Sequence, residues 1–285
     1  MSARNPSQGI ALSIIAMLCL AGVDATGKHL VQTYPIVEIM AIRFAIFFSI
    51  VMATNVFSGR IPRFHSSVAF TQITRSLVLA AEVAVFIFSF SLMPLADVHA
   101  IAAVAPLITL VMAGVCLGET IGRRSWASVA LGLLGALLII RPGMGVMSWH
   151  ALAPICGAIL WAWYQILSRQ VAAFDSAETT VLYTAFIGLA VFGLFAPIDW
   201  VTPNSADWGL LALNGALGAL GHYLLIRALV YAPASVLQPF GYALLIWAIL
   251  IGYLVFGDWP DAMTLVGAAV VVGAGIYASR PVQQA

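Results

Sequence analysis

Charged residues are scarce in this sequence of 285 residues, where Lys, Arg, Asp and Glu make up 8% of the chain. An ordinary soluble domain carries about 25%. Hydrophobic residues make up 62%, and the formal net charge is only +1. The small net charge argues against nucleic acid as a partner, since no extended field of one sign is available to attract it. This composition indicates an integral membrane protein whose surroundings are the lipid bilayer.

Cysteines and catalytic motifs are also few. Cys19, Cys116 and Cys156 stand alone inside apolar stretches without a C-x-x-C pair, so we expect no disulfide framework and no metal site. Isolated cysteines of this kind are usually buried packing residues. The sequence contains neither H-E-x-x-H nor G-x-S-x-G. We therefore expect no enzyme activity and no cofactor. A channel or a structural subunit is the other alternative to a transporter, and flux through a channel would not saturate with substrate.

Long apolar stretches fill almost the whole chain. A membrane-spanning helix needs about 20 mostly apolar residues. Pro, Gly and charged residues divide the sequence into ten such stretches, at approximately 9–32, 36–57, 69–93, 95–117, 124–141, 148–170, 177–197, 206–231, 234–256 and 262–279. The first stretch lacks the short apolar core and A-x-A exit of a cleaved signal, so we interpret it as the first helix. The predicted fold class is an all-α integral membrane protein with ten transmembrane helices.

The positions of Lys and Arg between the helices predict the orientation. With the N-terminus inside, the outer side receives only Arg141. The inner side then receives Arg4, Arg60, Arg63, Arg123, Arg124, Arg169, Arg227 and Arg280. Eight positive residues against one predict that both termini lie in the cytoplasm.

An internal repeat divides the chain into two halves, 1–143 and 144–285. "LGET" at 117–120 precedes "IIRPG" at 139–143, and "FGDW" at 256–259 precedes "ASRPV" at 278–282, with 22 residues between acid and Arg in both cases. A shift of 139 residues superposes these motifs, and a shift of 141 lays "CLAGVDATGKHL" over "LWAWYQILSRQV". Because each half has five helices, an odd number, the second half enters from the opposite face. Such inverted repeats are typical of secondary transporters.

These motifs resemble one family. The "LGE" that ends the fourth helix, "IRF" in the second helix and "LWAWYQILSRQ" at the start of the second half are similar to the EamA-type drug/metabolite transporter superfamily. The resemblance covers essentially the whole chain. It implies transport of amino acids or other metabolites, while more distant relatives carry nucleotide sugars or triose phosphates. The aromatic amino acid exporters look the most similar branch. One departure is Leu20, where the family pattern usually has Trp.

Charges embedded in the apolar stretches need a partner, a cavity or a nearby interface, because an ionisable side chain at the bilayer centre costs roughly 2.5 to 3.5 kcal/mol. Asp24 and Lys28 are one helical turn apart, so either they form a structural pair or Asp24 lies on a central pathway. Arg43 favours a structural role over ligand contact. Arg75 and Glu82 share one helix face. Glu82 either stays protonated or faces water with a basic neighbour, and we leave pathway and structural roles open for both.

Histidines and aromatic residues at membrane depth have the same two interpretations, hydrogen-bonded or packed core residues on one hand and pathway residues on the other. His222 follows a glycine-spaced stretch, which either brings helices close together or leaves open volume. Aromatic residues at this depth would form a pocket that stacks planar groups. The candidate pathway residues are Asp24, Arg75, Glu82, His99, Trp163, Tyr164, His222, Tyr223, Gln238 and Tyr242. Pro106 and Pro239 interrupt helix interiors and are candidate hinges for gating.

The sequence thus predicts a secondary transporter of a cell (inner) membrane with a small-molecule substrate. We expect export of small organic metabolites, above all aromatic and other apolar amino acids, by alternating access around a mid-membrane cavity. The alternative is uptake or exchange of another metabolite, such as a nucleoside-like or methylated amino acid compound. Lys28, Arg43 and Arg75 are too few embedded cations to favour phosphorylated cargo. Proton coupling through Asp24, Glu82 or His222 and downhill exchange are both compatible with the sequence, which leaves direction and oligomeric state open.

Overall fold

The computed structural model describes residues 6–57, 64–117, 123–140, 149–171, 173–231 and 237–279. The regular structure in these ranges is helical throughout, with no β-strand. In chain order the elements are α1 (Pro6–Leu30), α2 (Ile36–Phe57), α3 (Ala69–Leu92), α4 (Leu95–Ala102), α5 (Ala105–Leu117), α6 (Arg123–Ile140), the 3-10 turn η1 (Trp149–Ala151), α7 (Leu152–Val171), α8 (Ala177–Phe195), η2 (Ala196–Asp199), α9 (Ser205–Tyr231), η3 (Gln238–Tyr242), α11 (Ala243–Phe256) and α12 (Ala262–Ser279).

Helical structure lies in each of the predicted apolar stretches, with ends close to those read from the sequence. Six of the described segments have at least 18 residues and enough apolar character to cross a membrane. Shorter apolar helices lie at Trp126–Ile139, Phe240–Phe256 and Ala262–Ala274. The prediction of an all-α membrane protein is therefore confirmed, whereas the number of crossings stays a prediction.

Local sequence explains where several helices begin and end. Pro35 separates α1 from α2, since proline cannot continue the preceding helix. Ser176 precedes α8, and its hydroxyl accepts a hydrogen bond from the backbone N–H of Thr179 at 3.2 Å. α11 ends at Gly257, whose φ of 72° is the left-handed conformation that glycine adopts without strain.

Two helix breaks occupy matching positions. α4 ends at Ala102 and α5 begins at Ala105, so Pro106 lies in the first turn of a new helix. Proline is tolerated there because the N–H it lacks would have no partner within the helix. Pro239 lies in η3, directly before α11, instead of inside an α-helix. The prolines do not superpose, but Ala103, between α4 and α5, shifted by 139 residues falls on Tyr242, where η3 meets α11, and we refer to these two positions as the helix breaks. Neither proline therefore lies in the interior of an α-helix as predicted: Pro106 is in the first turn of α5 and Pro239 is in the 3-10 turn before α11.

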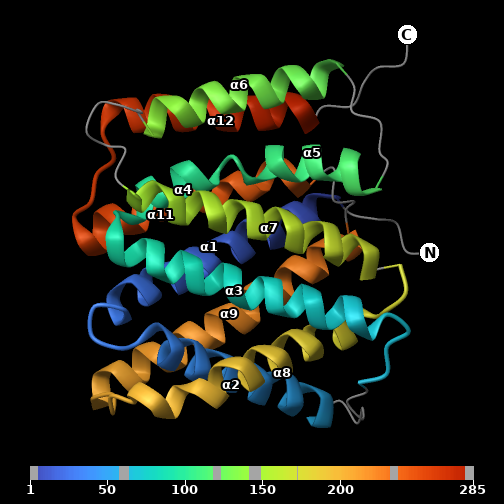
Figure 1. Cartoon of the computed structure of the whole chain (residues 1–285), viewed down its shortest axis with the longest axis vertical. Helices are drawn as coiled ribbons and strands as arrows, with labels where there is room; N and C mark the ends of the chain where they lie inside the picture. Colours follow the sequence, from blue (N-terminus) through green and yellow to red (C-terminus); the bar gives the residue numbers. More distant parts are fainter. Residues whose placement is uncertain are drawn as a thin grey trace.

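The helices form a layered bundle (Figure 1), with α6 and α12 at one edge and α2 and α8 at the other. The main packed pairs are α1 with α9, α3 with α7, α2 with α8, and α6 with α12. In chain order, α1, α2, α3 and α6 of the first half correspond to α7, α8, α9 and α12 of the second. Replacing each helix by its counterpart turns the α1–α9 pair into the α7–α3 pair and leaves the α2–α8 and α6–α12 pairs unchanged. α1 begins and α12 ends at the same end of the bundle (Figure 1).

Close contacts between small and aromatic residues hold the layers together. In lipid, helix association depends on such packing more than on a hydrophobic driving force. A Cβ added to Gly188 of α8 would lie 2.4 Å from the ring of Phe44 on α2, so glycine is required for this approach. The Phe44 ring also stacks on Phe192, with centroids 5.9 Å apart. The α2–α8 edge is accordingly a tightly packed part of the bundle.

Candidate transport cavity

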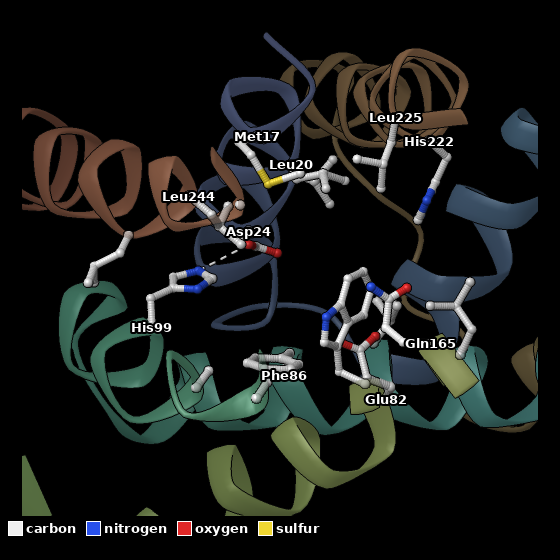
Figure 2. A pocket seen from close by; sticks show the side chains of 18 of the residues that line it. Met17, Leu20, Asp24, Glu82, Phe86, His99, Gln165, His222, Leu225 and Leu244 are labelled. Carbon is white, nitrogen blue, oxygen red and sulfur yellow. Dashed lines mark ion pairs between the residues drawn. The ribbon is translucent and has the colours of Figure 1, made fainter. Parts of the chain in front are cut away.

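A cavity of about 510 Å³ lies within the bundle, lined by residues of α1, α2, α3, α4, α5, α7, α9, η3 and α11 and by Ala103 between α4 and α5 (Figure 2). Its volume is in the range of about 300 to 1,000 Å³ that small-molecule sites occupy. The lining is mostly apolar with a few polar groups. The polar and aromatic residues that line it are Ser13, Asp24, Arg43, Glu82, Phe86, His99, Trp161, Gln165, Ser168, Arg169, His222 and Tyr242.

Two acids reach this cavity from different helices. Asp24 projects from α1 and Glu82 from α3 (Figure 2). Oδ2 of Asp24 lies 3.1 Å from Nε2 of His99, an ion pair whenever His99 is protonated, although its alignment is not that of a hydrogen bond. The His99 ring lies beside Phe86 and Phe90, with centroids 6.2 and 5.6 Å away. The structure thus places Asp24, Glu82 and His99 of the predicted set around one space.

Lys28 points away from Asp24 although the two residues are one turn apart. Its ammonium group pairs with the carboxylate of Asp258, in the loop after α11. It also lies 4.4 Å from the ring centroid of Phe256. The pair considered from the sequence, Asp24 with Lys28, is therefore not the one that forms. Asp24 faces the cavity, whereas Lys28 joins the end of α1 to a loop.

Arg75, for which the sequence left pathway and structural roles open, does not line the cavity. Its guanidinium donates to the backbone oxygen of Thr180 at 2.9 Å and to the hydroxyl of Thr184, both on α8. Nε donates to Gln72 at 3.3 Å, and the guanidinium carbon lies 5.3 Å from the centroid of the Tyr164 ring. Tyr164, also a candidate pathway residue, is likewise not part of the lining. Arg75 lies on the same face of α3 as Glu82 but about 10.5 Å closer to the start of the helix, where α7 and α8 surround it.

The aromatic residues divide by helix face. Tyr242, one of the candidate pathway residues, lines the cavity. Trp163 and Tyr223 do not, and their side chains are 44% and 56% exposed on the outside of the bundle. Successive helix residues are rotated by about 100°, so Trp163 points away when Trp161 and Gln165 face the cavity. Their placement on the pathway is corrected by this geometry.

His222 lies on the cavity lining, and its ring stacks on Phe47 with centroids 5.9 Å apart. The glycine-spaced segment before it serves close helix approach. A Cβ on Gly215, for example, would lie 2.7 Å from Ile46 of α2. Gln238 belongs to η3, and its side chain lies outside the described ones.

The cysteines differ from one another. Cys19 is buried, as expected, but Cys116 and Cys156 are exposed on the outside of the bundle. In the part of the chain that the structure describes, no three His, Cys, Asp or Glu side chains gather as a metal ion would require.

Comparison with known proteins identifies the family. The model of the EamA-like transporter family matches this chain twice, at residues 7–141 and 147–279. This chain is an EamA-like transporter. It is therefore a multi-pass membrane protein, and in bacteria such transporters lie in the inner membrane. Members of the family are transporters and not enzymes, which agrees with the expectation from the sequence.

Several EamA-like relatives have names that describe their cargo. A riboflavin transporter of Vibrio cholerae is 32% identical over 59% of this chain and 57% of its own length. An S-adenosylmethionine uptake transporter of Rickettsia bellii is 26% identical over 96% of this chain and 94% of its own. A pseudopaline exporter of Pseudomonas aeruginosa is 26% identical over 95% and 96%. A solved crystal structure covering 97% of both chains, with a TM-score of 0.69 and 17% identity, shares the fold. None of these names refers to aromatic amino acids.

In this EamA-like transporter the lining also includes Phe86, Trp161, Gln165 and Arg43, which were not among the candidate pathway residues predicted from the sequence. One signal was available for Gln165, because the shift of 141 superposes it on Asp24. No comparable signal separates Trp161 from Trp163 in a helix that is apolar on most faces. Leu20, the departure from the family pattern, also lines the cavity, where Leu occupies less space than Trp.

Proposed function

We propose that this chain is a secondary transporter that works by alternating access between two inverted five-helix repeats, 1–143 and 144–285, with both termini in the cytoplasm. Three observations support the repeat: the family model matches each half, the packed helix pairs are preserved when the halves are exchanged, and the two helix breaks superpose. Ala103 and Tyr242, at these breaks, both line the cavity. Bending at the two breaks would change access to the cavity from either end of the bundle.

The substrate we propose is a metabolite with a planar ring and a polar or charged arm. The cavity combines the ring faces of Phe86 and Trp161 with the charged groups of Asp24, Glu82 and Arg43, and this combination carries the proposal. At a packing density of about 0.75, the cavity accommodates about 380 Å³ of ligand atoms. That is the size of a nucleoside joined to an amino acid, or of a flavin, whereas a single amino acid fills only part of it.

Nucleoside-like compounds bearing an amino acid are therefore the better supported class, and the names of the Rickettsia and Vibrio relatives favour cargo of this size. Export of aromatic amino acids is the second candidate, supported by the aromatic and charged lining. The direction of transport has to be tested together with the substrate, since the relatives include an uptake transporter and an exporter.

Counterflow into proteoliposomes tests this function. Vesicles are loaded with unlabelled S-adenosylmethionine, riboflavin, tryptophan or phenylalanine, and entry of the labelled compound is followed with and without a pH gradient. We expect saturable entry of at least one ring compound, and stimulation by the gradient only if protons are coupled. No saturable entry of any of the four would overturn the proposal, and entry that never saturates would indicate a channel.

Two tryptophans of α7 supply a matched pair of variants. Trp161→Ala removes an aromatic face of the cavity, whereas Trp163→Ala removes one from the outside of the bundle. Base or ring stacking on an aromatic side chain contributes about 1 to 3 kcal/mol, so Trp161→Ala should raise the half-saturation concentration about 5- to 150-fold. Trp163→Ala should leave it nearly unchanged. Equal effects of the two variants would contradict the placement of the substrate ring.

A further inference from the structure

Arg43 is the buried cation of the cavity whose bonding is incomplete. It lies on α2, is 4% exposed and belongs to the lining. Its Nε has no hydrogen-bond partner among the described residues. A guanidinium offers five N–H donors and stays charged in proteins. Burying such a group without acceptors costs several kcal/mol, so an arrangement that persists needs an explanation.

Arg75 shows what a purely structural arginine looks like in the same bundle. It is buried as deeply as Arg43, but its guanidinium has acceptors on Gln72, Thr180 and Thr184, and it does not touch the cavity. The difference between the two arginines is therefore their set of acceptors and not their burial. Gly218 of α9 lies beside the Arg43 guanidinium, since a Cβ added to it would lie 3.4 Å from Nε. Glycine has no side chain that could accept a hydrogen bond from Arg43.

Two acidic groups line the same cavity as Arg43. Asp24 and Glu82 both attract its charge through space. In the described part of the chain, neither acid forms an ion pair with Arg43, and the ion pair of Asp24 is with His99. The cavity lining therefore holds a positive group and two acidic groups that form no ion pair with it. A zwitterionic ligand is complementary to this lining, because its negative group can pair with the cation of the cavity and its positive group with the acids.

Other polar atoms of the lining are also without partners. Of the seven buried side-chain atoms that lack a hydrogen-bond partner among the described residues, three belong to Arg43, Ser168 and Tyr242, all on the cavity, and a fourth, Nε2 of His99, faces Asp24 at 3.1 Å without the alignment of a hydrogen bond. Buried polar groups in proteins are almost always bonded. Their concentration on one surface indicates that a polar ligand supplies the missing partners.

We propose that Arg43 binds the carboxylate of an α-amino acid head group, while Glu82 and Asp24 face its ammonium group. A carboxylate accepts two parallel N–H bonds from a guanidinium, the strongest and most directional pairing available to Arg. The inference rests on the transport function proposed above and narrows it, because it requires a zwitterionic arm on the substrate and excludes a neutral ring compound such as riboflavin as the preferred cargo. Arg43 is then a specificity-determining residue.

Equilibrium binding of radiolabelled compounds to the purified full chain in detergent tests this proposal. Tryptophan and S-adenosylmethionine are compared with tryptamine and decarboxylated S-adenosylmethionine, which lack the carboxylate, and with indole-3-propionic acid, which lacks the amine. Riboflavin is the neutral probe. In the wild type we expect loss of the carboxylate to weaken binding about 10- to 100-fold, as for a charged hydrogen bond made in a buried site.

The variants assign this discrimination to a residue. Arg43→Gln should reduce the carboxylate preference to within about threefold, and Arg43→Lys should retain part of it because Lys keeps the charge but not the two-bond geometry. Glu82→Gln should instead reduce the preference for tryptophan over indole-3-propionic acid. Arg75→Lys is the matched control, expected to lower the melting temperature and to leave the carboxylate preference unchanged.

The outcomes separate the head group from the function. If the wild type binds ring compounds equally with and without a carboxylate, or prefers riboflavin, the role of Arg43 is overturned and the transport function stands. The role is also overturned if Arg75→Lys changes the preference as much as Arg43→Lys does. If no ring compound binds or crosses, the proposed function falls, and the role of Arg43 falls with it. Because the wild-type ligand series needs no variant, a misfolded Arg43→Gln does not prevent a decision.

Discussion

The ion pair between Lys28 and Asp258 should hold one end of the cavity closed. It joins the end of α1 to the loop after α11. The cavity extends to Ser168 and Arg169 near the end of α7 but includes neither Lys28 nor Asp258. Under the predicted orientation, the closed end is the outer one. Removing the pair should therefore raise the population of the state that is open at the Lys28 end.

The burial of the pair sets the size of this effect. The side chains of Lys28 and Asp258 are 14% and 28% exposed, between a surface pair and a buried one. Exposed pairs contribute about 0.2 to 1 kcal/mol, and close charges at an effective dielectric constant of 20 attract by about 4 kcal/mol before desolvation. A value of about 1 to 2 kcal/mol follows, which changes the ratio of closed to open states about 5- to 30-fold.

Cysteine labelling measures this population. The three natural cysteines are replaced, and Leu244→Cys places one thiol on the cavity lining (Figure 2). A membrane-impermeant maleimide added on the Lys28 side should then label Lys28→Met about 5 to 30 times faster than the parent. Asp258→Asn should have the same effect, and the double variant no more. The charge swap Lys28→Asp with Asp258→Lys should restore slow labelling. His29→Gln, at an exposed neighbour, is the control. Rates within twofold of the parent for both single variants would refute the closing role.

Three further predictions concern the cavity, the packing and the loop side. Asp24→Leu should lower the initial rate of counterflow more than about tenfold, and Lys28→Leu far less, because of the two residues only Asp24 lines the cavity. Gly135→Ala should destabilise the α6–α12 contact by about 1 to 3 kcal/mol, seen as a lower melting temperature, because its Cβ would lie 2.8 Å from a backbone oxygen of α12. The Tyr34 hydroxyl donates a 2.7 Å hydrogen bond to the carboxylate of Asp207 on α9, which raises the pKa of Tyr34. The stabilising effect of that bond should persist below pH about 10 and disappear as the pH rises through the raised pKa, so the melting curves of wild type and Tyr34→Phe should converge there.

A specific result would contradict each of these three predictions. Equal transport by the Asp24→Leu and Lys28→Leu proteins would mean that Asp24 is a structural residue. Gly209→Ala is the packing control, since nothing lies within 4 Å of a Cβ at that exposed helix position. A melting temperature lowered as much by Gly209→Ala as by Gly135→Ala would remove the clash as the cause. Identical melting curves of Tyr34→Phe and wild type at neutral pH would show that the bond to α9 adds no stability.

Much of the architecture is predictable because crossing a membrane makes strong demands on composition. The apolar stretches, the separation of α1 from α2 at Pro35 and the position of α8 after Ser176 follow from local residues. The match of Asp24 with Gln165 under the 141 shift also places both on one cavity. Local sequence was less informative at the helix breaks, because the breaks superpose while Pro106 and Pro239 do not.

Which side chains point toward the cavity and which toward the outside was decided only by the packing of the helices into a bundle. Trp161 and Trp163 belong to the same apolar run, and lipid is as apolar as a protein interior, so hydrophobic periodicity does not tell which of them faces inward. Arg43 and Arg75 are also alike as residues embedded in apolar helices. Thr180 and Thr184 of α8 supply acceptors to Arg75, whereas Arg43 meets a cavity. Those acceptors are more than 100 residues away along the chain.

Composition and motif spacing were therefore sufficient for the membrane location, the family and the segments that become helices, because these depend on local burial of the backbone in lipid. Which charges pair was decided only when distant helices packed. Lys28 lies one turn from Asp24 in the same helix, yet its partner is Asp258 from the other half of the chain, and Asp24 faces His99 and the cavity. Electrostatic partners depend on distances in space, and in this bundle the packing of the two halves sets those distances.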